Sequence, residues 1–169
     1  LGQLMEPMGT MTFDEAYELY KEQVVCAEKY GADVILFETM SDLLEVKAAV
    51  LAAKENTSLP IFVTMTFQED GRTFVGCDPI SCAVTLSGLG VDALGVNCSL
   101  GPNELIKTVE ELIKYSKVPV MVQPNAGLPR IEDEKTVYDI TAKEYTEAVK
   151  KMVDMGVRIV GGCCGTTPE

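Results

Sequence analysis

The sequence contains no histidine, has no long hydrophobic run and carries few basic residues. Without histidine, the chain cannot form Ser-His or Cys-His catalytic pairs or a zinc site with imidazole ligands. No stretch of about 18 apolar residues occurs, so we expect no transmembrane helix. The 14 Lys and Arg residues are outnumbered by 26 Asp and Glu residues, for a net charge of −12. Because no basic cluster suits phosphate groups, we expect neither nucleic acid nor an anionic membrane as a partner.

The N-terminus has no basic region followed by an apolar run, so the sequence shows no secretory signal. We therefore expect a cytoplasmic protein. The first residue is Leu1 rather than Met, which leads us to expect a fragment of a longer chain.

Cysteine is well represented, with six residues in the chain. Without a secretory signal, a disulfide scaffold is not expected, and the thiols should be either buried apolar residues or metal and catalytic ligands. Cys26 and Cys82 occupy apolar-spaced positions of expected helices, and we interpret both as core residues. Cys77 lies in an expected loop, and its role stays open. The remaining three are Cys98, Cys163 and Cys164.

Short apolar runs alternate regularly with helical patterns along the whole chain. The apolar runs begin near residues 33, 60, 92, 118 and 157. Thr12 followed by Glu15 predicts a capped helix that continues to Gly31. Nearly continuous apolar strands that alternate with helices indicate parallel βαβ units, so we expect one α/β domain over residues 1–169.

Two architectures fit this alternation, a doubly wound sheet and a (β/α)₈ TIM barrel. No Gly-x-Gly-x-x-Gly motif follows the first strand, which weakens the dinucleotide-binding alternative. Polar and sulfur-containing residues follow the strands at their C-terminal ends, where barrels build their sites. Five strands are too few to close a barrel, so we expect the first three βα units to be absent and the open edges to favour self-association.

Three cysteines, Cys98, Cys163 and Cys164, follow expected strands. Three thiolates can bind Zn²⁺ and leave a fourth position for water or substrate, which is typical of a catalytic site. Two alternatives remain at this point: packed small residues, or a disulfide between Cys163 and Cys164. Glu38 ends an apolar run, where it could bind a substrate ammonium group or form a salt bridge.

Several segments resemble the zinc-dependent homocysteine S-methyltransferase family. They are VNCSLGP, GGCCGTTPE, FETMSDLLEVKAA, FVTMTF and GRTFVGCDP, and they occur in the family's order over nearly the whole chain. Within the family, the similarity is greatest to the homocysteine-binding barrel of cobalamin-dependent methionine synthases. The resemblance implies a (β/α)₈ TIM barrel of which this chain covers about strands four to eight.

The resemblance also implies an activity and its residues. Cys98, Cys163 and Cys164 would be the zinc ligands, and Glu38 would contact the amino acid end of homocysteine. Zinc would activate the thiol of homocysteine for methylation in methionine biosynthesis. Cobalamin and methyltetrahydrofolate would act through other domains or subunits that carry the methyl donor. The alternatives are a zinc methyltransferase subunit acting on another thiol, and an inactive half-barrel that only assembles.

Overall fold

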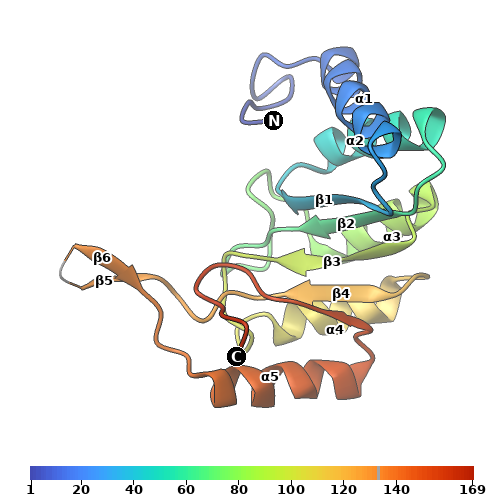
Figure 1. Ribbon diagram of the computed structural model, residues 1–169. Coiled ribbons are helices and arrows are strands. Elements are labelled where there is room, and N and C mark those ends of the chain that lie inside the picture. The colour runs from blue at the N-terminus through green and yellow to red at the C-terminus, as the bar shows by residue number, and fades with distance from the viewer. Residues whose placement is uncertain (133) are drawn as a thin grey trace.

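The computed structural model describes residues 1–132 and 134–169 and consists of a parallel sheet with helices packed on one face (Figure 1). The strand order is β1-β2-β3-β4-β7, so strands that are consecutive in the sheet follow one another along the chain. A separate antiparallel hairpin consists of β5 and β6. The elements are α1 (Phe13–Lys29), β1 (Ile35–Met40), α2 (Leu43–Asn56), β2 (Ile61–Met65), α3 (Pro79–Leu89), β3 (Ala93–Asn97), α4 (Ile106–Tyr115), β4 (Val120–Gln123), β5 (Arg130–Glu132), β6 (Lys135–Val137), α5 (Ala142–Met155) and β7 (Ile159–Val160).

The expected alternation of helices and parallel strands is confirmed. Each strand of the sheet begins within two residues of its expected position. The sheet stays open, because β1 and β7 are its edges and do not pair with each other among the described residues. The expectation of an unclosed sheet is therefore also confirmed.

Helix α1 begins where the capping signal predicts. The Glu15 backbone N–H donates to Thr12 Oγ1 at 3.2 Å, and the Thr12 backbone N–H donates to the Glu15 carboxylate at 2.9 Å. These reciprocal bonds satisfy two of the donors that a helix start leaves free. The bond from the Thr12 backbone lowers the pKa of Glu15 from its ordinary value.

Removal of this cap gives a prediction for stability. We expect Thr12→Ala to lower the free energy of unfolding by about 1 kcal/mol, because the side-chain acceptor at the helix start is lost. Urea unfolding followed by circular dichroism measures the change. Thr10→Ala is the matched control, because Thr10 is exposed and lies just before the cap. An equal loss in both variants would contradict the capping role of Thr12.

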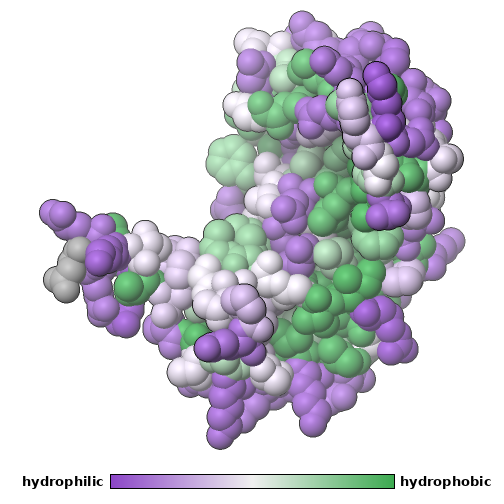
Figure 2. Space-filling view, viewed as in Figure 1, coloured by the Kyte–Doolittle hydropathy of each residue, from purple (hydrophilic) through white to green (hydrophobic). Residues whose placement is uncertain are grey.

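The core lies between the sheet and its helices. Alternate strand residues point into it, for example Phe37, Val63 and Leu94, which are aligned in the sheet register. The opposite face of the sheet has no helix on it among the described residues, and in Figure 1 it lies in front of α3 and α4. Leu36, on this opposite face, is exposed, and Figure 2 shows hydrophobic side chains on this side of the molecule.

The connection between β4 and α5 is the longest in the sheet and includes an element of its own. It contains the hairpin of β5 and β6, which projects from the side to which the arrowheads of β1 to β4 point (Figure 1). Nearly all described residues of the hairpin strands are exposed. Because neither strand has a buried face, its sequence lacks the alternation that identifies a strand.

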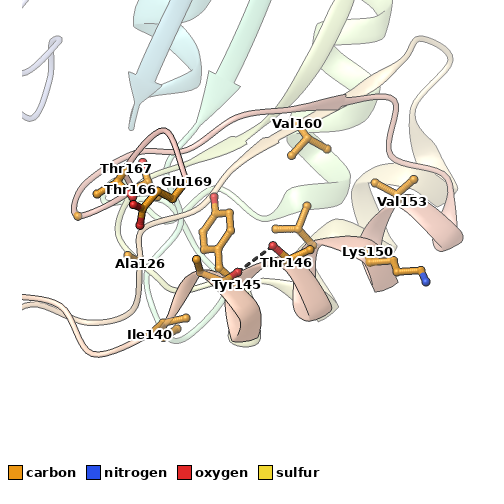
Figure 3. Close-up of a pocket in the computed structure, with 13 residues that line it drawn as sticks. Ala126, Ile140, Tyr145, Thr146, Lys150, Val153, Val160, Thr166, Thr167 and Glu169 are labelled. Carbon is orange, nitrogen blue, oxygen red and sulfur yellow. Dashed lines mark hydrogen bonds between the residues drawn. The ribbon is translucent and has the colours of Figure 1, made fainter.

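A groove of about 510 Å³ lies between α5, β7 and the C-terminal segment. Figure 3 shows Tyr145 rising from α5 into this space, with Val153 farther along the helix and Val160 on the strand side of the groove. The Tyr145 hydroxyl donates to the Gly161 carbonyl oxygen at 2.8 Å, and burial raises the pKa of Tyr145 to about 12. Val160 is in register with Val122, a core residue, so the groove is on the helix side of the sheet.

None of the helices in residues 1–132 and 134–169 has the length and apolar content needed to cross a membrane.

Candidate metal centre

Three thiols from distant parts of the chain meet at the C-terminal edge of the sheet. Cys98 directly follows β3, and Cys163 and Cys164 follow β7. Cys98 Sγ lies 3.8 Å from Cys164 Sγ, and the Sγ atoms of Cys163 and Cys164 are 3.9 Å apart. All three sulfur atoms lie within 4.8 Å of one another. The cysteines are free, so the alternative of a disulfide between Cys163 and Cys164 does not describe this structure.

The spacing of the sulfur atoms suits a tetrahedral ion. Zinc–sulfur bonds of about 2.3 Å at the tetrahedral angle place neighbouring sulfur atoms about 3.8 Å apart. The two measured separations, 3.8 Å and 3.9 Å, match this value. A disulfide would require an S–S distance of about 2.0 Å. The geometry therefore fits three ligands of one ion better than a redox pair.

An unusual backbone conformation presents the Cys98 thiol. Cys98 and Ser99 have φ angles of +63° and +64°, in the left-handed region that non-glycine residues rarely adopt. This conformation costs about 1–2 kcal/mol per residue. It is held by two hydrogen bonds, from the Cys98 N–H to the Gln123 carbonyl oxygen at 3.0 Å and from the Leu100 N–H to the Cys98 carbonyl oxygen at 2.8 Å. Backbone strain of this kind clusters at functional sites.

Backbone hydrogen bonds hold Cys163 and Cys164 against the segment that follows β4. The Cys163 N–H donates to the Pro124 carbonyl oxygen at 2.9 Å, and the Ala126 N–H donates to the Cys164 carbonyl oxygen at 2.9 Å. The Cys164 N–H donates to Asn125 Oδ1 at 3.0 Å. The two thiols are therefore positioned by tertiary contacts rather than by a regular element of their own.

Tyr138 lies beside the thiols, although nothing in its sequence context predicts this. Gly165 has a φ of +79°, and a Cβ atom there would lie 2.3 Å from Cγ of the Tyr138 ring. The pKa of Tyr138 is raised, mainly by partial burial and secondly by the neighbouring Cys164 thiol. Gly165 thus lets the tyrosine ring approach the cluster.

The thiols influence one another's ionisation. Burial, together with the hydrogen bond that the Cys163 thiol donates to the neighbouring Cys98 thiol, raises the pKa of Cys163 to about 11. Without a positive partner, the Cys163 thiol therefore stays protonated at neutral pH. A divalent cation would reverse this preference, because metal coordination deprotonates a thiol.

Comparison with known proteins identifies the family of the chain. The sequence model of the family described as homocysteine S-methyltransferase matches residues 1–169. The chain belongs to the homocysteine S-methyltransferase family. The resemblance inferred from the sequence motifs is thereby confirmed.

Two methionine synthases, from Mycobacterium leprae and Mycobacterium tuberculosis, are each 34% identical to the chain. The alignments cover 99% of this chain and 14% of each methionine synthase. The chain thus spans about one-seventh of the length of these relatives.

The homocysteine methyltransferase MmuM from Escherichia coli has a similar structure. Its apo form superposes with a TM-score of 0.77 at 19% identity, covering 98% of this chain and 57% of that chain. Its metallated form has a TM-score of 0.78 at 21% identity, covering 94% of this chain and 50% of that chain. At this level of identity the likeness shows the fold, and it confirms the expected class, part of a (β/α)₈ barrel.

Glu38 lies within β1 rather than at its end, where the apolar run in the sequence led us to expect it. It does not end a buried strand, because β1 continues to Met40 and the Glu38 side chain is exposed. The ion pairs between described residues do not include Glu38, so the salt-bridge alternative gains no support. Its neighbour Thr39 is hydrogen-bonded to Asn97, the residue before Cys98.

The other three cysteines do not join the cluster. Cys82 is fully buried, as expected. The core interpretation of Cys26 is wrong, because Cys26 is exposed. The buried stripe of α1 consists of Ala16, Tyr20 and Val24, and a residue two positions after Val24 faces nearly the opposite direction on a helix.

Cys77 is half-buried, and its Sγ lies 3.6 Å from Cys82 Sγ. The two residues flank the start of α3, where Asp78 is the N-cap. They occupy the positions of a hydrophobic staple, in which the residue before the cap packs on the fourth helical residue. This arrangement assigns Cys77 a structural role.

Proposed function

We propose that this chain takes part in zinc-dependent methyl transfer to the thiol of homocysteine, giving methionine. The observation that carries the proposal is the convergence of three thiols within 4.8 Å, in a chain of this family. Cys98, Cys163 and Cys164 are the proposed zinc ligands. The full protein would supply the methyl group.

The donor set favours zinc over other common ions. Thiolates are soft ligands that select zinc and exclude magnesium or calcium. Three protein ligands leave one of the four tetrahedral positions for a substrate, as in catalytic zinc sites. The metallated form of MmuM provides a related fold that holds a metal.

The chemistry follows from this arrangement. Zinc bound here would lower the pKa of a thiol in the fourth position, so that the homocysteine sulfur is ionised at neutral pH. The three cysteine side chains would fix the position of that sulfur at the edge of the sheet. In the transfer, a sulfur–carbon bond forms while the bond between the methyl carbon and its donor breaks. Glu38 is our candidate for binding the substrate ammonium group, since its carboxylate is exposed and free of ion pairs among the described residues.

The methyl donor is proposed to be methylcobalamin or methyltetrahydrofolate, bound by other domains of the full protein. The methionine synthases that match this chain are about seven times as long as the aligned segment, which leaves room for such domains. Self-association through the open edges of the sheet stays a prediction.

Zinc analysis of the reduced protein tests the proposal. We expect one zinc ion per chain after removal of loosely bound metal, and release of about one proton when homocysteine binds, because its thiol ionises on coordination. Titration with cysteine and 2-mercaptoethanol distinguishes homocysteine from other thiols, the alternative substrates considered above. A reduced chain that neither contains nor takes up zinc would refute the proposal.

A further inference from the structure

Strand β1 contains an irregularity next to the candidate substrate residue. Phe37 pairs with Val63 and Met40 pairs with Met65, so three steps along β1 match two along β2. The extra residue makes a β-bulge at Glu38 and Thr39, and Thr39 has a φ of +60°. Bulges re-aim side chains and release backbone donors from the ladder.

The side chain of Asn97 forms hydrogen bonds with the bulge residue Thr39. Its Oδ1 accepts from the Thr39 N–H at 2.8 Å, and its Nδ2 donates to Thr39 Oγ1 at 2.7 Å. Because the Thr39 N–H can only donate, the atom facing it must be Oδ1, which fixes the orientation of the amide. The bulge is thus held by two bonds to a residue on β3, two strands away.

The same amide also contacts the thiol cluster. Oδ1 accepts a second bond from Thr64 Oγ1 at 2.8 Å, and Nδ2 lies 3.9 Å from Cys163 Sγ, at the long end of an N–H···S hydrogen bond. Asn97 is 1% exposed, and both acceptor sites and both donor sites of its amide have partners. Its main chain leads directly into Cys98.

We propose that Asn97 is a positioning residue that couples the Glu38 bulge to the sulfur atoms of the metal centre. Through Thr39 it fixes the direction of the Glu38 side chain, and through Nδ2 it orients the sulfur atom of Cys163. The inference rests on the proposed function and extends it, because it makes amino acid recognition and metal binding depend on one buried amide. A purely structural role would affect stability but neither of these properties.

The variant Asn97→Asp tests the inference with almost no change of size. It replaces the donor that faces Cys163 with an acidic oxygen, next to sulfur atoms that become negative on metal binding. We expect Co²⁺, used as a spectroscopic probe for zinc, to bind about tenfold more weakly, with a shifted sulfur-to-cobalt charge-transfer band. Thr64→Val is the matched control, since it removes a partner of Oδ1 and leaves both contacts of Nδ2. Cobalt affinity within twofold of wild type is expected for this control.

Coupling to Glu38 is measured separately. Homocysteine affinity of the cobalt-loaded protein is determined for wild type, Glu38→Gln, Asn97→Asp and the double variant. If Asn97 directs Glu38, the losses of homocysteine affinity in the two single variants will not add in the double variant. The reason is that Asn97→Asp already misplaces the Glu38 carboxylate. Additive losses would overturn the coupling.

Thr39→Val is a second test variant, which keeps the inference testable if the Asn97→Asp protein does not fold. Thr39 is exposed, and valine keeps the branched shape while removing the hydroxyl that Nδ2 contacts. We expect homocysteine to bind severalfold more weakly at unchanged cobalt affinity. Wild-type homocysteine affinity in this variant, or a wild-type cobalt spectrum in Asn97→Asp, would overturn the inference. A wild-type chain that binds neither cobalt nor zinc would overturn the proposed function, and the inference with it.

Discussion

Replacement of Cys98 by serine is expected to abolish stoichiometric zinc binding. A serine hydroxyl does not ionise near neutral pH and is a far poorer ligand than thiolate for a borderline-soft metal. Loss of a residue that merely supports a ligand weakens metal affinity by about 10- to 100-fold, so loss of a ligand should exceed about 100-fold. The remaining pair, Cys163 and Cys164, would leave half of a tetrahedral site unfilled.

Metal content after dialysis and affinity measured against a competing chelator give the result. Cys26→Ser is the matched control, because Cys26 is an exposed free cysteine on α1 and lies outside the cluster. It should retain one zinc ion per chain. Thermal unfolding of both variants shows whether the fold is kept. One zinc ion per chain in Cys98→Ser, bound with wild-type affinity, would contradict the proposed ligand set.

Gly95→Ala is expected to cause the largest loss of stability. Gly95 lies in β3, the middle strand of the sheet, and is in register with Met121 of β4. A Cβ atom at Gly95 would lie 1.8 Å from the Met121 carbonyl oxygen and 2.6 Å from its carbonyl carbon. These are backbone atoms, so no side-chain rotation relieves the clash, and the two strands must separate. We expect the free energy of unfolding to fall by about 4 kcal/mol, a large share of the stability of a typical domain.

The control substitution should change the free energy of unfolding in the opposite direction. Gly88 lies near the end of α3, and a Cβ atom there would meet nothing within 4 Å. Gly88→Ala should therefore stabilise the protein by about 0.5–1 kcal/mol through helix propensity. Urea unfolding followed by circular dichroism compares the two variants. A Gly95→Ala protein within 1 kcal/mol of wild type would show that β3 and β4 do not approach each other so closely.

Local signals in the sequence predicted much of the fold. The capping box of Thr12 and Glu15 lies where the sequence predicts, and α2 and α3 also begin at local signals, an N-cap at Asp42 and Pro79 in the first turn. Such signals work because a helix start depends on residues within one turn. The buried parallel strands were also predictable, because apolar residues on both faces make a continuous run.

Other features depended on contacts that no local pattern encodes. The exposed position of Cys26 follows from which face of α1 packs on α2, and the hairpin of β5 and β6 has no buried face to give a pattern. The bulge at Glu38 and Thr39 depends on the register between β1 and β2. Register is a property of two strands, so the sequence of one strand does not reveal it.

The sequence by itself determined that thiols follow the strands β3 and β7. In a parallel sheet the ends of these strands share one edge, so Cys98 was expected near Cys163 and Cys164 although 65 residues separate the first two in the chain. Only the tertiary structure decided how the groups meet: sulfur spacings of 3.8 Å and 3.9 Å, a left-handed backbone at Cys98, and a buried Asn97 amide between the thiols and the bulge. These features depend on strand register and on hydrogen bonds between strands, which form only when distant segments pack together.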